Sequence, residues 1–314
     1  MLTVLLFLSA SVARAQGTGP LKLEQTIPLP DVQGRIDHLS IDVAGQRLFV
    51  SALGNNTVEV VDLKAGKRAN SISGLKEPQG ALYIPNKNRL FVASGKDGTV
   101  KIFEGTSLQL LKAIEYGDDA DNLRYDAARQ RIYVGFGSGA LGEMDSDGQK
   151  IAETKLDAHP ESFQLERNSS RIYVNLPGSR KIAVVDREAH SVVTSWGMGL
   201  TLGNYAMSLD EADHRLFVVV DTATSKVVQK LLAVGDCDDI FFDATQKRIY
   251  ATGGQGAISV FEQQDADHYR EIARVPTVKG ARTSFFSPEL GRLYVAVRRQ
   301  GSTAAKIEVF AVGQ

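Results

Sequence analysis

A motif of one arginine followed by three apolar residues recurs seven times in this chain and constrains its fold more than any other feature. The copies begin at Arg47, Arg89, Arg131, Arg171, Arg215, Arg248 and Arg292. Successive arginines are 42, 42, 40, 44, 33 and 44 residues apart. A period near 40, carried by β-branched and aromatic residues, is typical of a β-propeller with one copy per blade. The sequence therefore predicts an all-β fold, a seven-bladed β-propeller.

Length and composition fit one closed domain. The 314 residues would allow two domains, but seven repeats of one kind form a single ring, predicted over residues 21–314. The net charge of −1 provides no global basic field that would attract nucleic acid or an anionic membrane. The single cysteine, Cys237, excludes an intramolecular disulfide and any CxxC or CxxCH motif, and therefore covalent haem attachment.

The first residues have the features of a secretion signal. Leu2 to Leu8 is mostly apolar, and Ala13-Arg14-Ala15 is a small-x-small cleavage site, although no Lys or Arg precedes the apolar run. We therefore expect a signal peptide over residues 1–15, a spacer over residues 16–20 and a periplasmic or secreted protein. The apolar run is too short to span a bilayer, so no transmembrane segment is expected in the mature chain.

The two ends of the repeat region are expected to pair. Residues 21–27 alternate in polarity as a strand does and precede the first full repeat, whereas the last repeat ends at strand-like residues 306–310 and lacks an outer strand. We therefore predict that the N-terminal strand completes the last blade, which would close the ring and cover two open edges.

Each repeat has an inner strand upstream of its arginine. Positions −8 and −6 from the arginine are nearly all apolar, as in Leu39 and Ile41, which predicts that they share one face of this strand and pack between blades. Position −5 is often acidic, as in Asp42. We interpret this acid as the start of a hairpin turn that bonds its own backbone, in preference to a surface ion-pair site.

The fifth repeat is shorter than the others. Val50 to Asp62 in the first repeat is 12 residues, whereas Val218 to Asp221 is 3, so 12 − 3 = 9 residues are missing. The missing part corresponds to a hairpin and most of a third strand. Three strands leave the chain at the wrong end of the blade, so we predict an irregular, poorly paired segment from Phe217 to Val234.

A ring of polar side chains is expected at one mouth of the central channel. Position −10 is polar or has a polar group in every repeat: Asp37, Gln79, Asp121, Glu161, Tyr205, Asp238 and Arg282. Further polar residues are expected beside this ring: Arg35, His38, Asn122, His159 and Asp239. Propellers bind ligands where such loops converge, so these twelve residues form the predicted ligand site. The alternative is a solvated rim that is acidic because loops favour Asp and Asn.

The acids of this ring raise the possibility of a metal site. Asp37, Asp121, Glu161 and Asp238 would supply oxygen ligands, which favour Ca²⁺ or Mg²⁺ over zinc. Cys237 stands between two acids that oppose thiolate formation, so it is not expected to be a nucleophile.

The repeat resembles the YncE/YVTN family of exported seven-bladed propellers. The matching elements are Asp-x-x-x-x-Arg-Leu/Ile-Phe/Tyr-Val, the segment Asn56 to Asp62 and the turn Gly66-Lys67. The resemblance implies an extracytoplasmic location and a binding role; one or more members bind DNA, and others are surface-layer proteins. It implies no catalytic motif.

Three functions remain open from the sequence, and a fourth, a redox propeller that carries haem or a quinone, is disfavoured because no CxxCH motif attaches haem. The first is a non-catalytic binding or scaffold propeller, expected to be monomeric, whose partner is a protein, an envelope component or a small polar ligand. The second is a metal-dependent hydrolase of the lactonase type, which would need the four acids to hold a metal. The third is single-stranded DNA binding by family analogy, which an acidic mouth disfavours.

Overall fold

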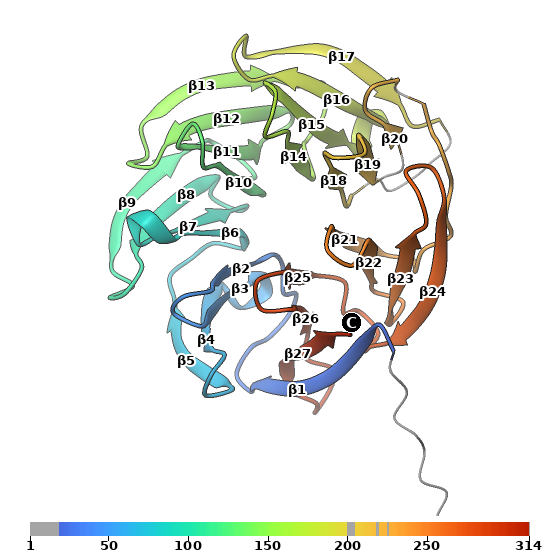
Figure 1. Cartoon of the computed structure of the whole chain (residues 1–314). Helices are drawn as coiled ribbons and strands as arrows, with labels where there is room; N and C mark the ends of the chain where they lie inside the picture. The colour runs from blue at the N-terminus through green and yellow to red at the C-terminus, as the bar shows by residue number, and fades with distance from the viewer. Residues whose placement is uncertain (1–18, 200–204, 218–219, 225, 314) are drawn as a thin grey trace, which may run out of the picture.

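The computed structural model describes residues 19–199, 205–217, 220–224 and 226–313, and its strands form a ring of sheets (Figure 1). Within these residues, six sheets have four strands and one sheet has three. The all-β propeller is confirmed. The prediction of seven blades is corrected, because only six blades are complete and the fifth repeat forms the three-stranded sheet.

The first three complete blades follow the chain in order. They consist of β2 (Leu39–Asp42), β3 (Arg47–Ala52), β4 (Thr57–Asp62) and β5 (Lys67–Ile72); β6 (Pro78–Ile84), β7 (Arg89–Ser94), β8 (Thr99–Glu104) and β9 (Leu110–Glu115); and β10 (Leu123–Asp126), β11 (Arg131–Phe136), β12 (Ala140–Asp145) and β13 (Lys150–Lys155).

The remaining sheets include the incomplete one. They consist of β14 (Phe163–Leu165), β15 (Arg171–Leu176), β16 (Lys181–Asp186) and β17 (Ser191–Gly197); β18 (Ser208–Asp210), β19 (Arg215–Phe217) and β20 (Val220–Asp221); β21 (Cys237–Asp243), β22 (Arg248–Gly253), β23 (Ala257–Gln263) and β24 (Tyr269–Pro276); and β25 (Ser284–Ser287), β26 (Arg292–Val297), β27 (Ala305–Val312) and β1 (Leu21–Leu29). Three 3-10 turns, η1 (Leu53–Asn55), η2 (Pro85–Lys87) and η3 (Pro177–Ser179), are the helical elements of the described residues.

The hydrophobic core lies between neighbouring blades. One cluster, for example, joins Phe91 and Ile102 of the second blade to Leu123 and Ile132 of the third. Position −8 of the inner strand contributes to this packing, as Leu123 and Phe163 show with exposed fractions of 3% and 0%. The predicted inter-blade role of this position is confirmed.

The acid at position −5 forms the expected hairpin turn. Asp42 Oδ1 accepts a hydrogen bond from the Gly45 amide at 2.9 Å. Asp243 Oδ1 does the same with the Thr245 amide at 2.9 Å. The Asp42 carboxylate also pairs with Arg47 at 2.7 Å, so one side chain holds both the turn and the motif arginine.

In four repeats the motif arginine connects its blade to the next. Four arginines donate to a backbone carbonyl of the following blade: Arg47 Nη1 to Gly105 O at 2.5 Å, Arg89 Nη1 to Ser146 O at 2.7 Å, Arg215 Nε to Ala266 O at 2.8 Å and Arg248 Nη1 to Gly313 O at 2.6 Å. The acceptors Gly105, Ser146 and Ala266 lie in turns between a third and a fourth strand. The repeated motif is therefore a structural link.

The ring closes as the sequence predicts. β1 pairs antiparallel with β27, from Leu21 opposite Val312 to Leu29 opposite Ala305. Figure 1 shows β1 as the outermost strand of the last blade. Ile27 and Leu29 are completely buried within the cluster that joins the last blade to the first.

An irregular segment replaces the missing strand of the fifth repeat. After β20, no strand is assigned among the described residues before β21. The segment instead lies against the sixth blade, where Gln229 exchanges two hydrogen bonds with the backbone of Tyr269, at 3.1 and 2.8 Å. Leu231 and Ala233 pack on the cluster that contains Phe217. This crossing returns the chain to the inner edge of the ring, and the predicted irregularity is confirmed for the described part of 217–234.

The predicted signal peptide and most of the spacer lie outside the described residues. In the part of the chain that the structure describes, no helix has the length and apolar character needed to cross a membrane.

Candidate functional site

The inner strands line a central cavity, and one repeat position contributes to the lining in every repeat. Position −7 lies between the core-facing positions −8 and −6, so it points the opposite way. The seven residues at this position are Ser40, Leu82, Arg124, Gln164, Ser208, Phe241 and Phe285. All seven line a cavity of about 440 Å³, which we call the inner cavity.

A second cavity of about 330 Å³, the mouth cavity, is lined by ten of the twelve predicted site residues. These ten are Arg35, Asp37, His38, Asp121, Asn122, Glu161, Tyr205, Asp238, Asp239 and Arg282. Seven residues line both cavities: His38, Asn122, Arg124, Gln164, Asp239, Ile240 and Phe241. The two cavities are therefore adjacent compartments of one channel.

Two predicted residues stay out of the mouth cavity. Gln79 turns its amide to Asp119, with Nε2 donating to Oδ1 at 2.8 Å. His159 places Nδ1 2.6 Å from the Gly137 carbonyl oxygen and Nε2 3.8 Å from Asp121 Oδ2. Both side chains therefore contact other residues of the channel mouth and do not line the cavity.

Sequence reasoning missed the residues that continue the site inward. Arg124, Gln164 and Phe241 all occupy position −7 and line both cavities. The available signal was the period of two along the inner strand, because a residue between two positions on one face of the sheet lies on the other face.

His38 is the centre of one polar cluster. Its Nδ1 lies 3.5 Å from Asp239 Oδ1, and its Nε2 lies 3.1 Å from Asn122 Nδ2. Burial acts to lower the pKa of His38, but the hydrogen bond and charge of Asp239, together with the charges of Asp37 and Asp121, outweigh it and raise the pKa to about 10. In the arrangement of the structure, Nε2 faces the amide donor of Asn122, so the imidazole proton lies on Nδ1, toward Asp239.

Arginines from the first and last blades pair with acids around His38. Arg35 lies 2.9 Å from Asp37, and Arg282 lies 2.7 Å from Asp238 and 3.0 Å from Asp236. Burial nevertheless raises the pKa of Asp238 to about 7; Arg282 opposes this shift, while Asp239 and Asp37 add to it. Burial also raises the pKa of Asp37.

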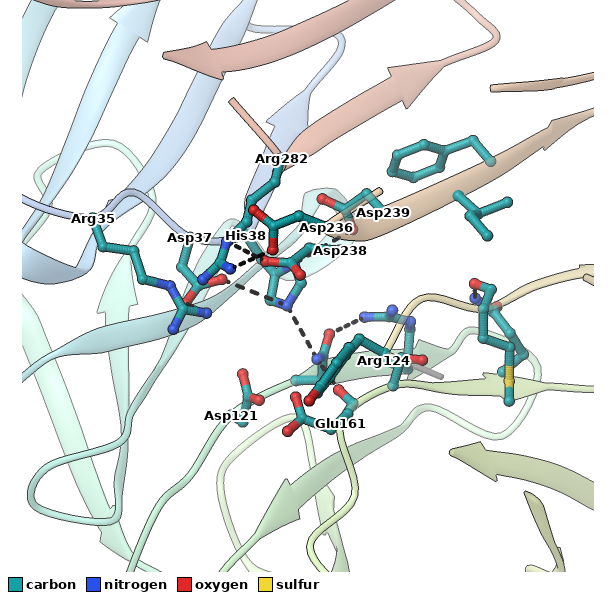
Figure 2. A pocket seen from close by; sticks show the side chains of 17 residues that line it. Arg35, Asp37, His38, Asp121, Arg124, Glu161, Asp236, Asp238, Asp239 and Arg282 are labelled. Carbon is teal, nitrogen blue, oxygen red and sulfur yellow. Dashed lines mark hydrogen bonds and ion pairs between the residues drawn. The ribbon is translucent and has the colours of Figure 1, made fainter. Parts of the chain in front are cut away.

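Asp121 and Glu161 form a second acidic group, opposite the first in Figure 2. Asp121 is 6% exposed, and its Oδ1 has no hydrogen-bond partner among the described residues. Burial, and then the charge of Asp121, raise the pKa of Glu161. A buried carboxylate oxygen without a partner costs stability unless a ligand or water satisfies it.

Arg124 points into the same space (Figure 2). Its Nη1 donates to Asn122 Oδ1 at 3.1 Å and to the Leu123 carbonyl at 2.9 Å, and its guanidinium lies over the Phe163 ring. Burial lowers the pKa of Arg124, while Asp239 and Asp121 act in the opposite direction. Across the described residues, no carboxylate lies within ion-pair distance of Arg124.

The four acids predicted to hold a metal are not gathered into a metal site. In the described residues, no group of three or more His, Cys, Asp or Glu side chains is arranged to hold a metal ion. The physical reason is that Arg35 and Arg282 bind Asp37 and Asp238. Cys237 is equally unsuited to nucleophilic chemistry, because burial, followed by the charges of Asp239 and Asp238, raises the pKa of its thiol to about 12.

Comparison with known proteins establishes the fold class, the β-propeller. No protein-family model matches the chain, and no curated protein matches it either. The YncE/YVTN resemblance is therefore not confirmed.

Solved structures do match. A chain of hydrazine synthase from Kuenenia stuttgartiensis has a TM-score of 0.72 at 17% identity, covering 90% of this chain and 98% of that one. A chain of the Mitotic Checkpoint Complex has a TM-score of 0.77 at 14% identity, covering 100% of this chain and 99% of that one. At such identities only the fold is shared; it is consistent with a binding or scaffold role.

Proposed function

We propose that this protein is an exported, non-catalytic binding propeller that holds a small polar ligand at the mouth of its channel. The observation that carries the proposal is the Oδ1 atom of Asp121, a buried acceptor that lines the mouth cavity without a partner in the described structure. A ligand that donates a hydrogen bond there would remove the cost of its desolvation.

The chemistry of the site supports binding over catalysis. A general base needs a lone pair that faces the ligand, whereas Nε2 of His38 already accepts from the Asn122 amide at 3.1 Å. The thiol of Cys237 is held protonated. The lactonase alternative lacks its metal cluster among the described side chains. Export and membership of the YncE/YVTN family remain part of the proposal, supported by the apolar N-terminus and the repeat motif.

A ligand screen tests the proposal. Thermal shift and calorimetry would be measured on the chain from Gln16 with amino acids, polyols, sugars and organic acids. We expect at least one class to stabilise the protein and Asp121→Asn to remove the effect. Asp157→Asn is the matched control, since Asp157 is half-exposed and paired with Lys181 at 2.6 Å. The proposal is wrong if no compound gives stabilisation that depends on Asp121.

A further inference from the structure

We propose that the ligand is a zwitterion with an apolar body, of the size and charge of an α-amino acid with an aromatic side chain. Its carboxylate would bind Arg124, its ammonium group would bind Asp121, and its apolar body would enter the inner cavity. This inference rests on the proposed binding function and specifies the ligand class.

Arg124 is suited to hold the anionic end. It lines both cavities, and of its donors only Nη1 has a hydrogen bond assigned within the described residues. A guanidinium with free donors can bind a carboxylate through two parallel hydrogen bonds. Stacking on Phe163 and the bonds from Nη1 fix the orientation of the guanidinium plane before a ligand arrives.

Asp121 is suited to hold the cationic end. Its unpartnered Oδ1 lines the mouth cavity, and Glu161 lines the same cavity from the next blade. An ammonium group has three donors and no acceptor, which matches carboxylate oxygens that lack donors. Asp121 lies two residues before β10 and Arg124 lies within it, and both side chains line the mouth cavity, so one small molecule there can contact both.

The inner cavity is suited to the apolar body. Phe241 and Phe285 from the sixth and last blades pack edge to face, with ring centroids 6.1 Å apart, and Leu82 lies in the same lining. In the ring, these two blades lie across from the third blade, which carries Arg124 (Figure 1). The inner cavity therefore has an aromatic wall opposite a cationic one, and its 440 Å³ falls in the usual range for small-molecule sites.

The balance of charge favours a zwitterion over a simple ion. The mouth cavity is lined by six acids, Asp37, Asp121, Glu161, Asp236, Asp238 and Asp239, against His38 and the three arginines Arg35, Arg124 and Arg282. An anion would meet this excess of acids on entry, and a simple cation would leave Arg124 without a counter-charge. A zwitterion satisfies both groups.

Four probes separate the three contacts. Calorimetry would compare phenylalanine with phenylalaninamide, which lacks the carboxylate, 3-phenylpropionate, which lacks the ammonium group, and glycine, which lacks the ring. We expect phenylalanine to bind at least about tenfold more tightly than each of the others, since losing a charge-assisted hydrogen bond costs a factor of that order.

Variants assign the contacts to residues. Arg124→Gln should weaken the binding of phenylalanine by about tenfold or more. It should weaken the binding of phenylalaninamide by much less, because that compound lacks the carboxylate. Arg124→Lys keeps the charge, so its affinity for phenylalanine should lie between those of wild type and Arg124→Gln. This variant controls for a folding defect in Arg124→Gln. Arg167→Gln is the control, because its side chain is 90% exposed on the turn after β14. Phe241→Ala should lower the preference for phenylalanine over glycine.

Each remaining outcome is decisive. The zwitterion inference is overturned if phenylalanine does not bind, or if it binds with an affinity that Arg124→Gln leaves unchanged. If phenylalanine does not bind while another polar compound binds through Asp121, the proposed function stands and only the inference of a zwitterionic ligand is wrong. If nothing in either screen depends on Asp121, both are wrong.

Discussion

Nδ1 of His38 lies 3.5 Å from Oδ1 of Asp239, although the two residues belong to the first and sixth repeats. The other oxygen of Asp239 accepts the Ser284 amide at 2.7 Å, so this carboxylate connects three blades at the mouth. Burial alone would lower the pKa of His38, and Asp239 supplies the largest opposing contribution.

Replacing this acid should lower the pKa of His38. In Asp239→Asn we expect the pKa to fall from about 10 toward the ordinary histidine value, which NMR titration of the imidazole would measure. A raised histidine pKa stabilises the fold fully below the unfolded pKa of about 6.5 and loses that effect as pH rises through about 10. The destabilisation by Asp239→Asn should therefore be larger at pH 6 than at pH 10. An unchanged His38 pKa would contradict this account; Asp265→Asn, at an exposed site, is the control.

The thiol of Cys237 should be unreactive in the folded protein. With a pKa of about 12, almost none of it is thiolate at pH 8, and the thiolate is the nucleophile. We expect iodoacetamide to modify Cys237 at pH 8 far more slowly in buffer than in denaturing urea, as followed by mass spectrometry. Equal rates in the two conditions would show that the thiol is neither buried nor perturbed.

The closing strand should carry a large share of the stability. Ile27 is completely buried and lies opposite Ile307, so Ile27→Ala should lower the free energy of unfolding by about 2–5 kcal/mol. Leu23, on the same strand, is 48% exposed, so Leu23→Ala should change the free energy of unfolding far less. Urea denaturation of both variants measures the difference. Similar costs for the two would mean that β1 does not seal the ring.

The fifth repeat should open more readily than its neighbour. β14 and β18 are both inner strands of three residues, but β14 belongs to a complete blade and β18 to the three-stranded sheet. Fewer ladder hydrogen bonds and an outer strand of only two residues predict faster amide hydrogen exchange in β18 and β19 than in β14 and β15. Exchange followed by mass spectrometry tests this, and equal protection would contradict it.

The repeat predicted the architecture because the same physical requirement recurs in each blade. Each motif arginine begins the second strand of its sheet, so counting from it located the inner strands, the closing strand and the short fifth repeat. It did not establish the number of complete blades, because one motif marks a repeat whether or not all four strands follow. Arg215 has its motif, and its sheet still has three strands.

The candidate site was predicted only in its outer part. Position −10 could be read from its polarity, whereas position −7 mixes Arg124, Ser40 and Phe241 and has no compositional signature. Whether a given side chain reaches the cavity also depends on partners from other blades. Gln79 and Asp121 share one position in the repeat. Gln79 binds Asp119 and does not line the mouth cavity, whereas Asp121 does.

The pairing of β1 with β27 affects how the protein is made. β1 has no pairing partner until residues 305–312 have been synthesised, so the ring cannot close before then. Blades made early can form their own sheets, but the final cooperative step needs residues 305–312. Such a chain remains incompletely folded until its last blade has been synthesised.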